Sequence, residues 1–445
     1  MNISIQSHLM VKGYLVILCV ISLSFLRPLL FAGLPIFVLI FVLLFRAKST
    51  ISTIIILVSM LGTIILASLY QGEFNISNNF LSLYFIFPIV IILFSRIKID
   101  DHNYFPFLIQ VMTLLLICNN LIGVVQLIRN PTDDDSFIGF YGTHGLGLHT
   151  LSIVNYLVGV YYFIRYQQEH RSKYFLLSLF FIFSAILSFY GLGLIIFLLS
   201  IFVYKFSLRN LIGSIFIFAF VLISFGTVLY MFKKQTFLYN IENIKRAELF
   251  FKKDVGEEEF ALIPRKLILF RNYVEGYSKD AGIFLLGSGP GTFNSRTYFL
   301  LNGDYSKSKS LENIFGTHQP KMAAKYVYPL WNTQNTGQYM DGTRNEPFSS
   351  IISLLAEYGF IIFTLIVITV YSKYSVTLSR VKQNQLNPHL AKYLKFASIF
   401  ILLNLFTDNF LEYPEIMFIY LLIFKLIEIS MNRERSATDT KQLIS

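Results

Sequence analysis

The chain has 445 residues, of which 55% are hydrophobic and only 14% are charged, and its formal net charge is +11. A soluble globular domain carries about 25% charged residues, so this composition is typical of a chain that lies largely in lipid, where charge is costly. The positive balance does not indicate a nucleic-acid partner, because the basic residues fall mostly in short loops between apolar runs.

The first apolar run begins near residue 9, after a short and weakly basic N-terminus. No small-residue cleavage pattern ends it, and Phe25-Leu26-Arg27-Pro28 leads directly into the next run. The pattern therefore predicts a retained span and not a removed signal peptide.

Apolar runs of the length that crosses a bilayer, about 17–25 residues, recur about twelve times. They lie near 9–26, 29–45, 51–70, 80–95, 105–128, 146–166, 174–189, 191–206, 210–232, 348–371, 393–408 and 413–430. We expect an all-α polytopic membrane protein with about twelve transmembrane helices: about nine in 9–232, the last three in 347–430, and a tail at 431–445. The region 174–206 fits either two spans joined at Tyr190-Gly191 or one span with a re-entrant piece.

Lysine and arginine alternate between loops. They gather at Arg46 and Lys48, at Arg96 and Lys98, at Arg165, Arg171 and Lys173, at Lys205 and Arg209, at Lys373, Arg380, Lys382 and Lys392, and at Arg433, Arg435 and Lys441. The loops between these sets, among them Glu412 to Glu415, are poor in basic residues. By the positive-inside rule both termini are expected in the cytoplasm and the poor loops outside.

One connection is far longer than the rest. Residues 233–346 carry both signs of charge and no cysteine, so neither a disulfide framework nor a cysteine-based zinc site is expected there. About 110 residues can fold as a small domain. Parity places this large loop outside, and a long loop crosses the membrane whatever its charge.

The loop contains a glycine-rich turn, Leu286-Gly287-Ser288-Gly289-Pro290-Gly291-Thr292-Phe293. Glycines at alternate positions allow a tight turn and a close approach of the backbone to a ligand. The N–H groups of Gly287, Gly289 and Gly291 are therefore candidates for holding an anion such as a phosphate. The alternative is a plain turn.

Upstream of the turn, Arg265 and Arg271 lie on a segment with apolar residues at helical spacing. A guanidinium grips a phosphate with two parallel hydrogen bonds, so both arginines are candidates for binding a diphosphate. Anchoring of the segment to lipid headgroups explains them equally well.

Acidic residues mark the end of the loop and the span that follows. Glu346 lies at the expected membrane edge, two residues after Arg344, and is a candidate base. The alternative is that Glu346 is an ordinary solvated acid of the loop. Glu357 lies inside an apolar span, where acids usually face the bundle interior; pairing with a nearby Arg or Lys is the structural alternative. His318 is a further candidate base, and no histidine pair has the spacing of a zinc hydrolase.

These features together resemble the bacterial O-antigen polymerase and ligase superfamily. Its members have about a dozen spans and a large periplasmic loop with an arginine, a Gly-x-Gly-x-Gly-aromatic turn, a Pro-His segment and a span containing Glu-x-Gly. The matching positions are Arg265 or Arg271, Gly287, Gly289, Gly291 and Phe293, Pro347, and Glu357-Tyr358-Gly359. The chain departs from the pattern at Phe348, where the family often has histidine, and at Ser188-Phe189-Tyr190-Gly191, where many members have a Ser-Arg pair.

The resemblance implies a polymerase that joins polyprenyl-diphosphate-linked sugar repeats into surface polysaccharide at the bacterial inner membrane. It implies no cofactor, no metal and no nucleic acid, membrane lipid as surroundings, and a flippase and a chain-length regulator as candidate partners. In this reading Arg265, Arg271 and the three glycines bind the diphosphate, Glu357 supports them, and Glu346, His318 and Arg344 are the catalytic candidates.

Two alternatives are weighed against the polymerase. A ligase of the same superfamily is weakened by Phe348, because the histidine taken to be catalytic in ligases is missing. A transporter of lipid-linked glycans would need charged residues spread through the spans and not concentrated in one loop.

Overall fold

The computed structural model describes the chain except for residues 1, 98–102, 131–135, 143–146, 206–218, 220–221, 224, 228, 232–233, 253–262, 302–313, 315, 317–318, 333–346, 384–387 and 445. All regular structure in the described part is helical, apart from an isolated bridge between Lys48 and Arg96. The expectation of an all-α chain is confirmed.

Among the described residues, five helices are long and apolar enough to cross a membrane. They are α4 (Ile51–Gln71), α5 (Ile76–Phe94), α6 (Phe105–Arg129), α7 (Gly147–Glu169) and the stretch Ser350–Val381 of α19 (Ser350–Gln383). Shorter apolar segments are His8–Ser22 of α1 (Asn2–Ser22), α3 (Leu34–Leu44), α8 (Ser172–Leu187) and α9 (Gly191–Lys205). Several long apolar helices thus give the chain the character of a membrane protein.

The region 174–206 forms two helices, α8 and α9, of 16 and 15 residues. The turn between them passes through Phe189, which has a positive φ of 53°. Both helices are shorter than a full membrane span, so two spans and one span with a re-entrant piece both stay compatible with this region.

Local signals explain where the helices begin and end. Thr50 accepts the N–H of Thr53, and the Thr53 hydroxyl accepts that of Thr50, which closes a capping box at the start of α4. The helix ends at Gly72, which has a left-handed φ of 63° that glycine adopts without strain.

The helices pack around one large apolar core. Its centre is α7, which is buried along most of its length, whereas α4 leaves much of its apolar surface exposed, as a helix facing lipid does. The helices α2 (Arg27–Ala32), α20 (Pro388–Asn404), η6 (Phe410–Glu412) and α21 (Pro414–Ile444) complete the bundle.

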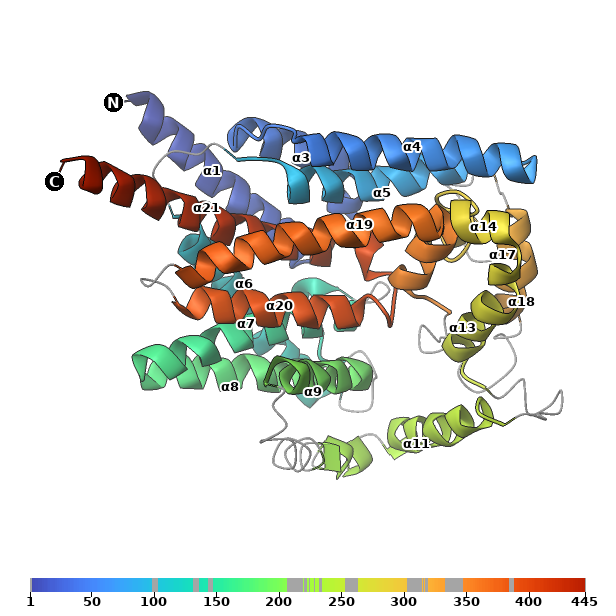
Figure 1. Cartoon of the computed structure of the whole chain (residues 1–445). Helices are drawn as coiled ribbons and strands as arrows, with labels where there is room; N and C mark the ends of the chain where they lie inside the picture. The colour runs from blue at the N-terminus through green and yellow to red at the C-terminus, as the bar shows by residue number, and fades with distance from the viewer. Residues whose placement is uncertain are drawn as a thin grey trace.

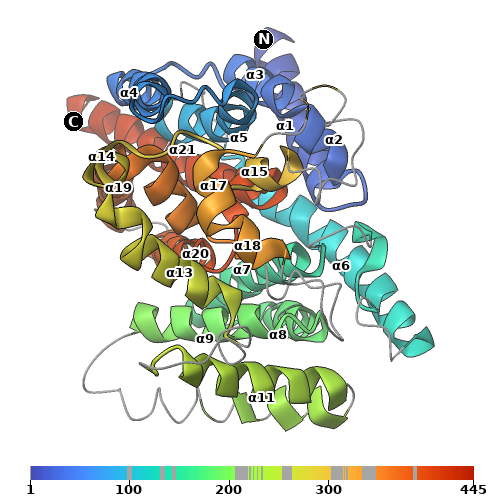
Figure 2. The same cartoon turned by 90° about the vertical axis from the view of Figure 1, so that its right-hand side faces the viewer.

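The large loop contributes short helices with a second apolar core. They are α11 (Lys234–Leu249), α13 (Arg265–Glu275), η3 (Tyr277–Lys279), α14 (Ala281–Leu286), α15 (Arg296–Leu301), α17 (Lys321–Tyr326) and α18 (Tyr328–Asn332). This core joins Leu269, Tyr273, Phe293 and Phe299 to Phe348 and Ile352 at the start of α19. Figure 1 shows both chain termini at one end of the bundle and α13, α14, α17 and α18 at the opposite end, which faces the viewer in Figure 2.

Candidate functional site

The glycine-rich turn follows α14 and is folded tightly against α19. Gly287, Gly289 and Gly291 have positive φ values of 83°, 98° and 74°, a conformation that favours glycine. A Cβ on Gly287 would meet the backbone of Glu357, and one on Gly291 would meet the backbone of Asn78. The alternate glycines are therefore needed to bring three segments into backbone contact.

Glu357 lies at the centre of this turn and is only 1% exposed. Its Oε2 accepts the N–H of Gly291 at 2.7 Å, and its Oε1 accepts the N–H groups of Phe293 and Ser295 at 3.1 Å each. Its carbonyl oxygen accepts the N–H of Gly289 at 2.9 Å. A buried carboxylate needs such donors, and the turn supplies them.

Glu357 is buried, and its partners are backbone N–H groups and not the Arg or Lys side chain of the structural alternative. The N–H groups of Gly289 and Gly291, expected to face a substrate phosphate, are bonded to Glu357, while that of Gly287 closes α14 on Ile283. The donors of the turn thus bind a carboxyl group of the chain itself.

A kink in α19 allows this approach. Gly359 has φ 70° and ψ 167° inside the helix, and a Cβ there would meet the Leu285 carbonyl oxygen and the Gly287 nitrogen. The glycine of Glu357-Tyr358-Gly359 and the first glycine of the turn thus touch through their backbones.

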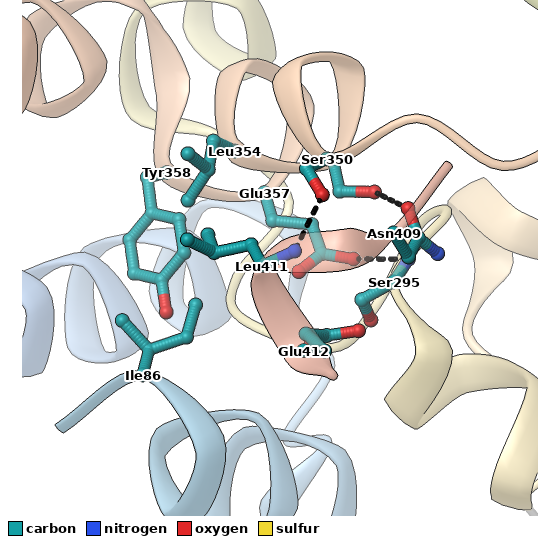
Figure 3. A pocket seen from close by; sticks show the side chains of 10 residues that line it. Ile86, Ser295, Ser350, Leu354, Glu357, Tyr358, Asn409, Leu411 and Glu412 are labelled. Carbon is teal, nitrogen blue, oxygen red and sulfur yellow. Dashed lines mark hydrogen bonds between the residues drawn. The ribbon is translucent and has the colours of Figure 1, made fainter. Parts of the chain in front are cut away.

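A second acid, Glu412 of η6, faces the same place. It is 4% exposed, and with Glu357, Ser295, Ser350 and Asn409 it lines a cavity of about 10 Å³ (Figure 3). This space is the size of one water molecule, so it cannot admit a sugar. Burial and the charge of Glu357 raise the pKa of Glu412 to about 8, against the opposing effect of Arg296. The sequence analysis had placed Glu412 in an outer loop and missed its burial.

Arg296 directly follows the glycine-rich turn and was also missed. Its backbone N–H donates to the Glu412 carboxylate, and its Nη1 donates to the Glu412 carbonyl oxygen at 3.4 Å. The guanidinium lies over the rings of Tyr413, at 4.3 Å, and Phe31, at 5.1 Å. The signal in the sequence was the position of this cation immediately after the turn.

The two arginines singled out on α13 lie elsewhere. Arg271 pairs with Glu275 at 2.9 Å on a partly exposed face, and Arg265 donates to the Leu330 carbonyl at α18. The α13 cation that reaches the bundle is Lys266, which donates to the Thr407 carbonyl oxygen.

The remaining candidates are placed as follows. Glu346, His318 and Arg344 lie outside the described residues. Phe348, at the position where the family often has histidine, is 2% exposed and its ring lies 4.3 Å from that of Phe299. No group of three or more His, Cys, Asp or Glu side chains that could hold a metal ion occurs in the part of the chain that the structure describes.

The site is thus a buried acid pair held by a glycine-rich turn, with Arg296 and Lys266 at its border. The hydrogen bonds of the two acids fix the large loop to α19 and η6. They also position Arg296, while Lys266 is held at the Thr407 carbonyl oxygen. No protein-family model, curated protein or solved structure matches the chain, so its function is argued from its own residues.

Proposed function

We propose that the chain is a membrane glycosyltransferase of the polymerase type, which joins polyprenyl-diphosphate-linked oligosaccharide repeats into surface polysaccharide. The observation that carries the proposal is the contact between two motifs of the family resemblance. The glycine-rich turn and Glu357-Tyr358-Gly359 are far apart in sequence, yet three N–H groups of the turn segment close on the Glu357 carboxylate. The proposal includes about twelve spans, cytoplasmic termini and an outer position for residues 233–346.

The physical logic of the reaction agrees with this architecture. A donor carried on a polyprenyl chain has to be met in the bilayer, and the chain has helices long and apolar enough to cross one. The leaving group is a diphosphate, so cations fixed at the border of bundle and loop would stabilise the charge that develops on it. Arg296 and Lys266 are fixed in this way, and Arg265 and Arg271 stay candidates on α13. The proposed proton acceptor is Glu346 or His318, and no metal or cofactor is invoked.

The ligase alternative is disfavoured by the surroundings of Phe348. Its ring belongs to the second apolar core, where it packs against Phe299. A phenyl ring accepts no proton, so the step assigned to histidine in ligases has no group at this position.

One observation favours a transporter as the second candidate. Lys425 is fully buried on α21, its Nζ lies 2.8 Å from Glu428 and 2.7 Å from the Ser95 carbonyl, and Glu428 also pairs with Lys373. Charges inside apolar helices often mark transport pathways. Here the three side chains are paired with one another and tie α5, α19 and α21 together, which is also what a structural cluster does.

Deletion of the gene in its own host distinguishes these functions. Loss of a polymerase is expected to leave surface glycan of a single repeat, because export and attachment continue without elongation. Loss of a flippase leaves no surface glycan, and loss of a ligase leaves polymer on the lipid carrier. The measurement is the length distribution of surface and carrier-linked glycan, with the wild-type gene restored as control. A wild-type ladder in the deletion strain would contradict the proposal.

A further inference from the structure

Glu357 and Glu412 form a buried carboxyl pair that the proposed reaction does not use. They come from α19 and η6, and both line the cavity of about 10 Å³ shown in Figure 3. A cavity of this size has room for one water-sized molecule and none for the hydration of two negative charges. Two like charges at one dry site disfavour each other strongly, so the pair is expected to hold fewer than two charges.

The two carboxyl groups differ in their hydrogen bonds. Both oxygens of Glu357 accept backbone N–H groups, three in all, which favours its ionised form. Glu412 receives the N–H of Arg296 on Oε2, while its Oε1 has no hydrogen-bond partner among the described residues. A bare buried carboxylate oxygen is unfavourable, whereas a protonated carboxyl is neutral and carries a donor.

The charged and titratable groups around Glu412 come from every element packed there. They are Glu357 and Tyr358 of α19, Arg296 of α15, Asp408 on the connection before η6 and Glu415 in the first turn of α21, whereas α5 contributes the apolar Ile86. The backbone N–H and the charge of Arg296, with the backbone N–H of Thr297, favour ionisation of Glu412. Burial and Glu357 outweigh them, and the pKa of Glu412 stays raised.

We propose that this pair is a binding site for one proton, held by Glu412, and that the proton keeps the glycine-rich turn in place against η6. Loss of the proton to solvent would put a second charge against Glu357 across the cavity and push the two segments apart. The site would then couple external pH to the contact between the large loop and the bundle. This inference stands on the geometry of the pair and does not depend on the proposed glycosyl transfer.

The test is the pH dependence of thermal stability of the full chain in detergent. The folded-state pKa of Glu412, about 8, lies above that of an unfolded glutamate, about 4.3, so its stabilising effect is complete below about pH 4 and is lost as pH rises to about 8. The apparent Tm should fall by on the order of 2 °C per pH unit in this window from Glu412 alone. Glu412→Gln, which mimics the protonated form, should remove this contribution and melt at least as high as wild type at about pH 8.

Glu275→Gln is the matched control, because Glu275 is an exposed glutamate whose ion pair with Arg271 lies outside the cavity; it should keep the wild-type slope. An unchanged slope in Glu412→Gln, or a lower Tm than wild type at every pH, would overturn the proposal, since that is how an ionised Glu412 would behave. If the variant does not fold, infrared difference spectra of the wild type between about pH 6 and about pH 10 replace it. Loss of a protonated carboxyl band supports the proposal, and its absence overturns it.

Discussion

The side chain of Glu357 does structural work that no other side chain of its size can do. Its two oxygens accept three N–H groups from the segment Gly291–Ser295, a set of donors that a carboxylate satisfies completely. Hydrogen bonds to a charged acceptor are worth roughly twice those between neutral groups. The glycine-rich turn is therefore held by the carboxyl group of one residue on α19.

Glu357→Gln is expected to destabilise the protein by about 2–4 kcal/mol. The substitution keeps the shape but places an amide NH₂ opposite backbone N–H donors, so at least one buried donor loses its acceptor. The measurement is the fraction of protein that stays monodisperse in detergent after heating. Glu242→Gln on α11 is the control, because Glu242 is an exposed acid in an i,i+4 pair with Arg246. Equal stability of the two variants would show that the three hydrogen bonds contribute little.

Among the elements, α19 connects the bundle to the loop. Its first turns belong to the second apolar core through Ile352 and Ala356, next to Phe348 just before the helix, and its continuation runs through the bundle. The kink at Gly359 lies between these two parts, at the point where the helix meets the glycine-rich turn. The first turns of α19 thus cover the loop core, and the rest of the helix packs in the bundle as a candidate span. Gly359 separates these two parts.

Gly359→Ala is expected to break this junction. The backbone conformation at φ 70° and ψ 167° is nearly restricted to glycine, and a methyl group would meet the Leu285 carbonyl oxygen. The expected loss of stability is more than about 2 kcal/mol, measured as a fall in apparent Tm in detergent. Gly62→Ala in α4 is the control: Gly62 is helical with nothing within 4 Å, so alanine there should be neutral or stabilising. A tolerated Gly359→Ala would mean that α19 can straighten without loss.

The two ends of the helical bundle differ in what they carry. Both termini lie at one end, and the helices α13, α14, α17 and α18 of the large loop lie at the opposite end (Figure 1). The paired Lys373, Lys425 and Glu428 hold α19 to α21. The alternation of lysine and arginine between loops predicts which end faces the cytoplasm. The acid pair and Arg296 would then lie on the outer side, where the proposed polymerase would elongate its glycan.

Reporter fusions test this orientation. A reporter that is active only outside the cytoplasm should be active when fused near residue 300 and silent when fused after residue 435. A reporter active only in the cytoplasm should give the opposite pattern at the same two positions. If the first reporter is silent near residue 300 and active after 435, the orientation and the outer position of the site are both wrong.

The sequence by itself determined the all-helical class, the positions of the long apolar helices and the need for glycine at 287, 289 and 291, because each of these follows from properties of a local stretch: apolar length, periodicity and backbone freedom. The tertiary structure alone decided that the anion held by the turn is Glu357, that Glu412 is buried beside it, and that Arg296 and Lys266, rather than Arg271, reach the bundle. Those outcomes depend on which distant segments pack together and on how much water is left between them. A single sequence records neither. An acid that the sequence places in a loop, such as Glu412, can therefore be buried in the folded protein.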